Sequence, residues 1–349
     1  MLTYSEVARI LGHYDMGELL SVTQAVRGYV NQTAFIQTEQ GRYVLRRNHR
    51  RLNEEAQRYR HKLVNYLVER DFPVPAFIPA RTGDTLLVLD GRYCEVMEFV
   101  AGSDFDPDHP HHLESVGESL AHYHNLTTYF PAPPDEAPPR YVPDNSLRLI
   151  EKLLERDVMG DLHDILSWYD RRAAHMRRIL SDAVYEALPR VVIHGDIHRD
   201  NFIFADGELV ALLDYDQVAY DSPLNDLADA LVAFASLPKS ANLISTWGVF
   251  QGPLDEAHAT RILRTYTHVR PLSESDITTL LNMLEVLWLH GELGRVVTTP
   301  EGAPEYHQSV LEQGVQLVEW LDKRRQHLVK SWTDVCQRAN NARYVAPAA

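Results

Sequence analysis

Residues 191–216 read VVIHGDIHRDNFIFADGELVALLDYD, and this stretch decides the fold. Its three leading apolar residues predict a short strand that ends in a polar loop around Asp196. Two further short apolar segments follow, and the Asp206-Gly207 pair between them is a strong signal for a tight hairpin turn. The stretch therefore predicts a strand, a polar loop and a hairpin, with Asp214 at the end of the last strand.

The polar residues of this stretch suit phosphoryl transfer. A carboxylate must orient the attacking hydroxyl and accept its proton, and Asp196 can do so. Magnesium binds through hard oxygen ligands, and Asn201 and Asp214 offer them. For any one of these residues alone, a polar group that merely caps a turn is the alternative. Their order between apolar strands favours phosphoryl transfer.

The spacing matches that of the protein kinases, in which the catalytic Asp is followed at five residues by Asn and later by a metal-binding Asp. Here the loop reads His-Gly-Asp, ending at Asp196, and the second motif reads Asp-Tyr-Asp, starting at Asp214. With an Asp-Leu-Ala segment at Asp226, the chain resembles the superfamily of aminoglycoside phosphotransferases, choline kinases and homoserine kinases rather than protein kinases proper. The resemblance covers roughly residues 20–235 and is strongest at 191–228.

This resemblance implies an α+β fold of the bilobal, protein-kinase-like type. An N-terminal lobe with an antiparallel sheet and one helix would bind the nucleotide, and a mainly helical C-terminal lobe would hold the catalytic and substrate-binding residues. The implied domains are residues 1–100 and 103–349, with a hinge at 97–102. Alternating apolar residues within 22–46 and 85–100 independently predict strands, and the Asp90-Gly91 pair predicts a tight turn between the two strands of the second range.

The resemblance also implies which residues contact ATP. The hairpin loop around Gly28 and Asn31 would cover the phosphates with backbone amides, and Arg46 would reach the α and β phosphates. In the hinge, the carbonyl of Glu98 and the amide of Val100 would meet the adenine. An ordinary turn and a solvated arginine are the alternatives for the loop and for Arg46.

One departure from the pattern concerns the amphipathic helix predicted at residues 52–70. A kinase-like fold places a Glu there to hold the base of the third strand, but the expected position falls near Arg60 or His61. The available acids, Glu54 and Glu55, lie one to two turns earlier. The sequence therefore leaves open which acid, if any, pairs with Arg46.

Two further polar residues of the motifs, His198 and Asp216, each have two possible roles. His198 either lies near the γ-phosphate, where protein kinases place a Lys, or packs. Asp216 either reaches a second metal or holds the loop. His124 and His194 are interpreted as structural, and Asp226 as a helix N-cap whose carboxylate braces the catalytic loop by resemblance.

The rest of the chain is predicted to be mainly helical after a Pro-rich loop at 131–146. Three side chains on one of these helices are candidates for an acceptor pocket, although a buried core helix explains the same pattern. These candidates are Glu285, Trp288 and His290, and the predicted helices are 4–11, 111–126, 256–268, 275–293 and 306–339, with further helical stretches in 147–187.

Composition limits the partners. The net charge is −15, and residues 1–102 hold 13 Lys+Arg and 12 Asp+Glu, so the acidic excess lies in the remainder. Such a surface repels nucleic acid, and it suits either general solubility or a cationic substrate. The sequence shows no signal-peptide pattern and no apolar run long enough for a membrane span, so a cytoplasmic protein without a membrane partner is expected. Two distant cysteines support neither a disulfide framework nor a cysteine zinc site.

Three functions remain open at this stage. The first is an ATP- and Mg-dependent kinase that phosphorylates a small-molecule hydroxyl acceptor, with homoserine or another amino alcohol as the leading acceptor and an aminoglycoside as the alternative. The second is a nucleotide-binding pseudokinase that acts as a regulator, an interpretation supported only by the missing helix Glu. The third, a protein kinase, is disfavoured because no Asp-Phe-Gly to Ala-Pro-Glu segment is present.

Overall fold

The chain divides into two compact units in the computed structural model, one named here the sheet unit and the other the helical unit. Three separate stretches of chain form the sheet unit, Met1–Phe105, Ala132–Asp135 and Asp200–Val218, and the helical unit comprises Asp106–Pro131, Glu136–Arg199 and Ala219–Ala349. The residues described are 2–25, 31–48, 53–134, 142–157, 160–237, 252–299 and 304–345. The functional division into a nucleotide-binding and a catalytic lobe remains a prediction.

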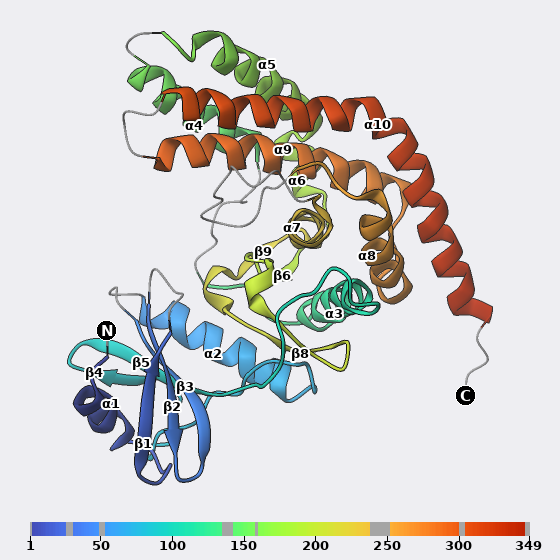
Figure 1. The fold of residues 1–349 in the computed structure, drawn as a ribbon. Coiled ribbons are helices and arrows are strands. Elements are labelled where there is room, and N and C mark those ends of the chain that lie inside the picture. The colour runs from blue at the N-terminus through green and yellow to red at the C-terminus, as the bar shows by residue number, and fades with distance from the viewer. Residues whose placement is uncertain are drawn as a thin grey trace. The chain divides into compact units, whose positions relative to one another are not determined.

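The sheet unit is built on five antiparallel strands in the order β1-β2-β3-β5-β4 (Figure 1). In its centre, Leu45 pairs with Ala34 on one side and with Val96 on the other, and all three side chains are fully buried. Because side chains alternate between the two faces of a strand, the neighbouring Arg46 points to the opposite face. The strands are β1 (Leu19–Gln24), β2 (Gln32–Thr38), β3 (Gly41–Arg47), β4 (Leu87–Leu89) and β5 (Arg92–Glu98).

Two helices accompany this sheet. Helix α1 (Tyr4–Leu11) begins with a capping box in which the Glu6 amide donates to the Thr3 hydroxyl and the Thr3 amide donates to the Glu6 carboxylate. Its buried side joins the core formed by the sheet. Helix α2 (Glu54–Val68) buries Leu63 and Leu67 completely, as its predicted amphipathic pattern requires.

Both predicted Asp-Gly turns are present. The pair Asp206-Gly207 has φ angles of 52° and 89° and joins β7 (Phe202–Ala205) to β8 (Glu208–Leu212), and Asp90-Gly91 joins β4 to β5 with φ angles of 51° and 71°. In a two-residue hairpin, the turn whose twist matches that of the strands needs a positive φ at both central residues. An Asp-Gly pair adopts these angles at low cost in free energy. The two residues of each turn therefore determine where both hairpins form.

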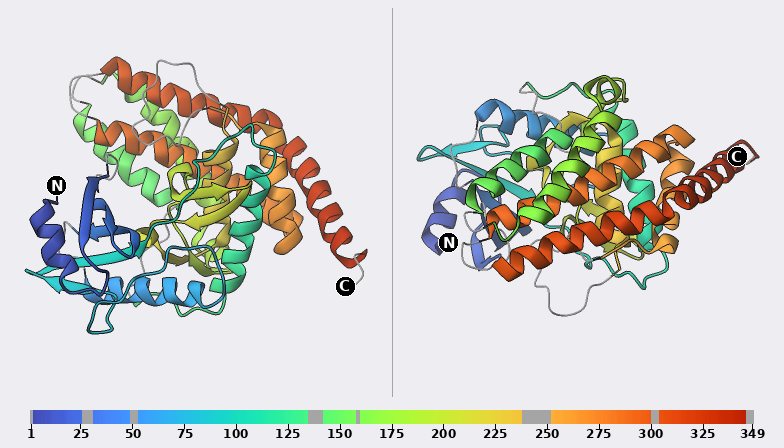
Figure 2. Two further views of the ribbon diagram at one scale, coloured as in Figure 1. Left: turned by 60° about the horizontal axis from the view of Figure 1, so that its bottom comes forward. Right: turned by 90° about the horizontal axis from the view of Figure 1, so that it is seen from above.

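The helical unit surrounds a short antiparallel pair of strands, β6 and β9. Figure 2 shows the long helices α9 and α10 lying side by side within it. Helices α3 and α8 approach each other closely at Gly117. A Cβ there would overlap the carbonyl oxygen of Ile262, so this approach depends on glycine having no side chain. The elements are α3 (His112–Thr127), α4 (Pro143–Arg156), α5 (His163–Ile179), α6 (Asp182–Glu186), β6 (Val191–Ile193), β9 (Ala219–Asp221), α7 (Pro223–Ala235), α8 (Glu256–Val269), α9 (Glu274–Thr298) and α10 (Pro304–Val345), with short 3-10 turns at Arg199–Asn201 and Tyr215–Gln217.

Two predictions at helix starts are wrong. The Pro-rich loop was predicted to extend to residue 146, but α4 begins at Pro143, because proline fits the first helical position, where no amide hydrogen is needed. Asp226 was predicted to be the N-cap of α7, whereas Ser222 holds that position, with its side chain accepting a hydrogen bond from the Leu224 amide. Asp226 lies in the first turn of the helix.

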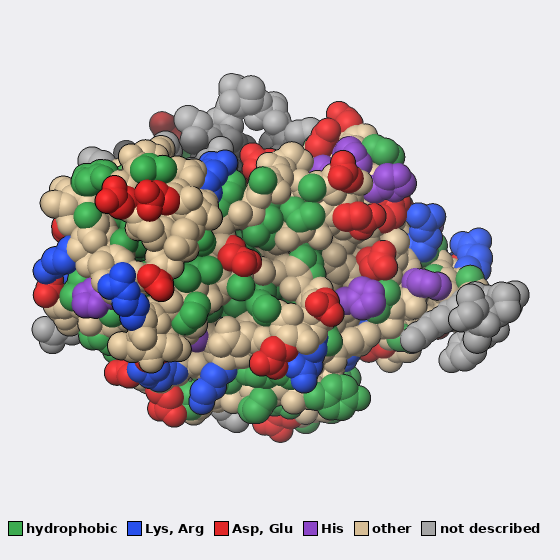
Figure 3. Space-filling view, turned by 90° about the horizontal axis from the view of Figure 1, so that it is seen from below, with side chains coloured by type: hydrophobic (Ala, Val, Ile, Leu, Met, Phe, Trp, Pro, Cys, Tyr) green, Lys and Arg blue, Asp and Glu red, His purple; other side chains and the backbone are tan. Residues whose placement is uncertain are grey.

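The described surface carries both signs of charge. On the face drawn in Figure 3, Lys and Arg side chains are interspersed with Asp and Glu. Among the described helices, none is both long enough and apolar enough to serve as a membrane span.

Candidate active site

The predicted catalytic loop leaves β6 in the helical unit and is anchored on α7. The backbone amides of His194 and Gly195 donate hydrogen bonds of 2.7 and 2.8 Å to the two carboxylate oxygens of Asp226. The brace predicted for Asp226 is therefore confirmed, although the residue is not the N-cap. His194 is fully buried, and its Nδ1 accepts a hydrogen bond from the Asp196 amide at 3.3 Å, which confirms its structural role.

A second anchor, which was not predicted from the sequence, involves Arg199. The Arg199 guanidinium donates a 2.6 Å hydrogen bond to the carbonyl of Ala233, near the C-terminal end of α7, where carbonyl groups lack helical partners. Burial lowers the pKa of Arg199 below its ordinary value. The loop from His194 to Arg199 is thus held on α7 at both of its ends.

Asp226 itself is held by a buried network. His124 Nε2 lies 3.1 Å from Asp226, and His124 Nδ1 lies 2.9 Å from the hydroxyl of Tyr266. Burial would raise the pKa of Asp226, but the hydrogen bonds from His124 and from the Gly195 amide lower it below its usual range. Burial lowers the pKa of His124 more than the carboxylate raises it. His124 is therefore neutral, and it is a packed residue, as predicted. We infer that its ring hydrogen is on Nε2, which donates a hydrogen bond to the Asp226 carboxylate.

Stability should depend on the protonation of His124. The unfolded chain binds a proton at His124 near pH 6.5, whereas the folded protein binds it only at lower pH. Between these two values the unfolded state holds the extra proton, so the free energy of unfolding should fall by up to about 1.4 kcal/mol per pH unit as the pH decreases. A His124→Gln variant cannot take up this proton, and its stability should change less between pH 7 and pH 5, as measured by urea unfolding.

A matched control for this experiment is His122→Gln on the same helix, because His122 is exposed. This variant should keep the wild-type slope. Equal slopes for the wild type and His124→Gln would contradict the assignment of a neutral buried histidine.

Asp196 and His198 lie together at the open side of the loop. Their side chains are each 31% exposed, and His198 Nε2 is 3.4 Å from an Asp196 carboxylate oxygen. A partly exposed carboxylate on a rigid loop can accept a proton from a substrate hydroxyl. The contact places His198 beside Asp196, and both catalytic assignments remain predictions.

The two predicted metal ligands, Asn201 and Asp214, lie at the two ends of the β7–β8 hairpin, in the sheet unit. Asn201 immediately precedes β7, and its carbonyl accepts a 2.8 Å hydrogen bond from the Leu213 amide, so the two ends of the hairpin are adjacent. The Asp214 side chain is 43% exposed, and its backbone has a φ of 60°. Non-glycine residues rarely adopt this conformation, which costs free energy and occurs often at functional sites.

This donor set fits a divalent cation. A carboxylate and a carboxamide are hard oxygen ligands of the kind that Mg²⁺ takes together with phosphate oxygens. Asp196 belongs to the helical unit and these two residues to the sheet unit, so the convergence of all three remains a prediction.

Arg46 has acidic partners on the sheet unit. Its guanidinium forms an ion pair with Asp216, lies 3.4 Å from Asp214 Oδ1, and lies 3.8 Å from Glu95 Oε1. The other groups on Asp216 are Asn31 Nδ2 at 3.1 Å and Arg60 Nη1 at 2.7 Å. The structure thus brings together Asn31, Arg46 and Asp214, which the sequence analysis had placed around one nucleotide.

Glu95 is the acid that the sequence analysis did not find. It lies directly opposite Arg46 in the β3–β5 register, and its side chain is only 1% exposed. Burial would raise the pKa of Glu95, but Arg60, His61 and Arg46 hold it well below its usual value. The missing helix Glu was the only support for a regulatory pseudokinase, and this ionised acid beside Arg46 removes that support.

The predicted hinge runs from β5 onto the hairpin. Glu98 ends β5, and its amide donates a 3.0 Å hydrogen bond to the carbonyl of Ala76. Beyond Val100, Ser103 exchanges backbone hydrogen bonds of 2.8 and 3.0 Å with Phe204 of β7. The chain is therefore hydrogen-bonded, directly after the predicted hinge, to the hairpin whose two ends hold the predicted metal ligands.

Gly102 permits this close approach of the chain to the hairpin. A Cβ on Gly102 would overlap the Ile203 side chain and lie 2.6 Å from the Phe204 carbonyl oxygen, so only glycine fits there without movement of the hairpin.

Gly28, which was predicted to lie in the phosphate-covering loop with Asn31, falls in the part of the chain that the structure does not describe. The adenine and phosphate contacts of Gly28, Glu98 and Val100 remain predictions.

Two of the three acceptor candidates on α9 are core residues. Trp288 is fully buried and packs edge-to-face against Trp320. Glu285 is also fully buried and forms ion pairs with Arg172 of α5 and Arg325 of α10. These contacts support the core interpretation for both residues, because a carboxylate held by two guanidiniums serves to join three helices.

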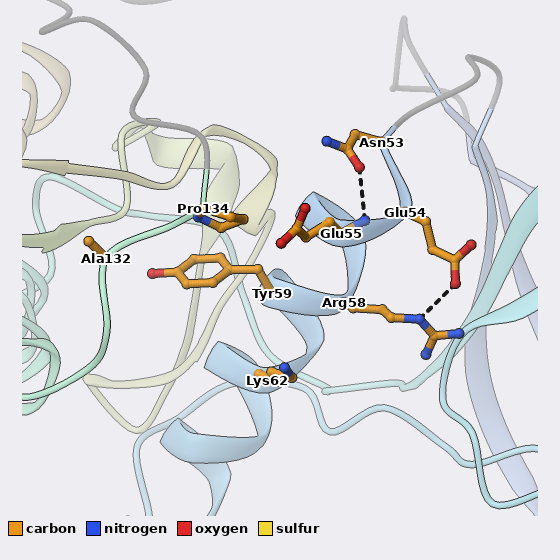
Figure 4. A pocket seen from close by; sticks show the side chains of 8 residues that line it. All are labelled: Asn53, Glu54, Glu55, Arg58, Tyr59, Lys62, Ala132 and Pro134. Carbon is orange, nitrogen blue, oxygen red and sulfur yellow. Dashed lines mark hydrogen bonds and ion pairs between the residues drawn. The ribbon is translucent and has the colours of Figure 1, made fainter.

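A hollow of about 540 Å³ lies at the N-terminal part of α2, away from the predicted site residues (Figure 4). Its lining includes Tyr59 and Pro134, together with Arg58 and Glu54, which form an ion pair with each other. None of the predicted catalytic, nucleotide-binding or metal-binding residues contributes to its described lining. The candidate active site is therefore defined by the motif residues and not by this hollow.

Comparison with known proteins identifies the family of this chain. Residues 21–272 match the model of the phosphotransferase enzyme family, APH. Homoserine kinase from Polaromonas naphthalenivorans is 27% identical over 285 residues, which span 80% of this chain and 82% of that protein. An amicoumacin kinase solved in complex with AMP-PNP, Ca²⁺ and Ami has a TM-score of 0.66 at 16% identity, covering 89% of this chain and 92% of that one. An aminoglycoside phosphotransferase from Alicyclobacillus acidocaldarius has a TM-score of 0.65 at 16% identity, with 94% and 95% coverage.

The fold and the motif residues define a phosphotransferase that acts on a hydroxyl group of a small molecule. The chain belongs to the phosphotransferase enzyme family, and its kinase-like α+β fold is the one implied by the sequence resemblance.

Proposed function

We propose that this protein is an ATP- and Mg-dependent kinase that transfers the γ-phosphate to the hydroxyl of homoserine or another amino alcohol. The observation that carries the proposal is the position of Asp196 on a loop whose preceding amides are both bound by the buried Asp226. Such a loop holds a proton acceptor in a fixed place, as in-line attack on a phosphate requires. The similarity to homoserine kinase supports the choice of acceptor.

Each residue has a role in this proposal. Asp196 orients the acceptor hydroxyl and takes its proton, with His198 beside it. Arg46 steadies the α and β phosphates. A magnesium ion held by Asn201 and Asp214 would neutralise charge on the phosphates when the nucleotide is bound. The backbone groups of the hinge and of the first hairpin loop complete the nucleotide contacts.

The alternative acceptor is an aminoglycoside. Residues 103–349 hold 37 Asp+Glu against 21 Lys+Arg, and such an acidic surface would attract a polycationic substrate. The similarity in fold to an aminoglycoside phosphotransferase is compatible with this acceptor. The cytoplasmic location expected from the sequence belongs to the same proposal, since ATP is its phosphate donor.

A panel of acceptors tests the proposal. Phosphate incorporation from labelled ATP would be measured with homoserine, choline, aminopropanol, kanamycin and a Ser/Thr peptide, with Asp196→Asn as the negative control. We expect turnover with an amino alcohol or hydroxylated amino acid. Turnover with kanamycin alone would select the alternative acceptor, and turnover with the peptide alone would overturn the proposal.

A further inference from the structure

The sheet unit carries its buried acid on a strand and not on helix α2. Where a kinase-like fold would place an acid on the helix and a base on the third strand, α2 presents a base, Arg60, and the acid Glu95 stands on β5. Both side chains are buried, and Arg60 forms an ion pair with Glu95. Two guanidiniums, Arg46 and Arg60, therefore flank one buried carboxylate.

Asp216 is the second carboxylate that these guanidiniums share. Arg46 Nη2 pairs with its Oδ2, and Arg60 Nη1 donates to its Oδ1 at 2.7 Å. Asp216 stands where the protein-kinase motif has a glycine, so this chain carries an extra negative charge beside Asp214. Arg60 supplies the positive charge that offsets it. The two departures from the kinase pattern thus lie in direct contact.

The oxygens of Glu95 are used unequally. Oε2 is bound by Arg60 and by His61 Nε2, the latter at 3.0 Å. Oε1 is buried, accepts no hydrogen bond from the described residues, and lies 3.8 Å from Arg46 Nη1. A buried carboxylate oxygen without a donor is costly, and a shift of about 1 Å by the Arg46 guanidinium would satisfy it. Arg46 therefore has two sets of carboxylate partners within reach, the aspartates after β8 and Glu95.

We propose that Glu95 and Arg60 are positioning residues for the nucleotide site. Glu95 takes the place of the helix acid and holds Arg46 when its guanidinium leaves Asp216 for the nucleotide phosphates, while Arg60 keeps hold of Asp216 and ties it through Glu95 to β5. Helix α2 thus contributes to nucleotide binding through a base instead of an acid. This inference rests on the proposed kinase function, because it assigns the partners of Arg46 in that site.

Binding of a non-hydrolysable ATP analogue with Mg²⁺, measured by calorimetry, tests this inference without any acceptor. Glu95→Gln and Arg60→Met should each weaken binding roughly tenfold or more, since each removes hydrogen bonds between charged groups. Arg60→Lys keeps the charge but not the fork of donors, and should fall between Arg60→Met and the wild type. The matched controls are Arg58→Met and Glu54→Gln, which alter an exposed ion pair on the same helix and should bind within about twofold of the wild type.

A double variant separates positioning from general destabilisation. Arg60 acts on Asp216 directly, so Arg60→Met combined with Asp216→Asn should bind no more than about twofold more weakly than the weaker single variant. Thermal melts identify any variant that fails to fold, and Arg60→Lys, which retains the buried charge, then carries the test. Wild-type nucleotide affinity in a folded Glu95→Gln variant would overturn the inference. If Glu95→Gln does not fold, wild-type affinity in Arg60→Lys would overturn it.

The outcomes also distinguish this inference from the proposed function. Weakened nucleotide binding in the variants, together with no phosphorylation of any acceptor by the wild type, would retain the positioning roles and reject the kinase activity. Phosphorylation by the wild type with unchanged nucleotide affinity in the variants would do the reverse.

Discussion

Replacing Asp196 with Asn should lower kcat for the preferred acceptor by about 10²–10⁴-fold, the usual contribution of a general base. The substitution keeps the shape of the side chain but removes its ability to accept the hydroxyl proton. The loop should keep its conformation, because Asp226 holds the amides of the two preceding residues. The KM for ATP should therefore change little, and steady-state kinetics with both substrates varied would measure the two effects separately.

Asp200→Asn is the matched control for this prediction. Asp200 follows four residues later in the same segment and is exposed, so its variant should retain nearly wild-type turnover. If Asp196→Asn retained the wild-type kcat, the assignment of the base would be wrong, whatever the acceptor.

Replacing Asp214 with Asn should raise the Mg²⁺ concentration needed for activity and lower kcat by about 10²–10³-fold, since the charge stabilisation supplied through a metal is worth several kcal/mol. Asparagine tolerates the left-handed backbone conformation that Asp214 adopts, so the substitution changes the charge and leaves the backbone nearly unstrained. Rate measurements over a Mg²⁺ titration, with Mn²⁺ binding as an independent readout, would test this expectation.

The hairpin supplies a close control in Asp206→Asn. Asp206 also has a positive φ, 52°, but it lies in the turn between β7 and β8. Its variant should leave the Mg²⁺ dependence unchanged. An unchanged Mg²⁺ dependence in Asp214→Asn as well would remove Asp214 from the metal site.

The features that were predicted correctly from the residues alone, without the family resemblance, depend on residues close in sequence. The turns at Asp90 and Asp206 follow from the backbone preferences of Asp-Gly pairs, and the helices follow from the spacing of apolar side chains. The brace by Asp226 was available only through the family resemblance, because the residue lies 30 positions after Asp196 in the chain.

The features that were missed depend on contacts between distant segments. Glu95 is the direct cross-strand neighbour of Arg46, but the register of β3 with β5 joins strands that are separated by an entire helix. Had that register been known, the pairing rule for opposite charges on facing strands would have identified Glu95. In the sequence, Arg60 stands out only because it lies near the position where a kinase-like fold has the helix Glu. Its role depends on its contact with Asp216, which is distant in sequence.

The composition of the sheet unit has a consequence for how the protein is made. Because Asp200–Val218 belongs to the same unit as the first 105 residues, an N-terminal fragment cut near residue 105 would lack the hairpin that bonds to Ser103. The ribosome must therefore synthesise two of the three stretches of the helical unit, Asp106–Pro131 and Glu136–Arg199, before the first unit can be completed. A single cleavage between these regions would not yield two self-sufficient fragments, and coexpressed halves would have to recombine to restore the β7–β8 contacts.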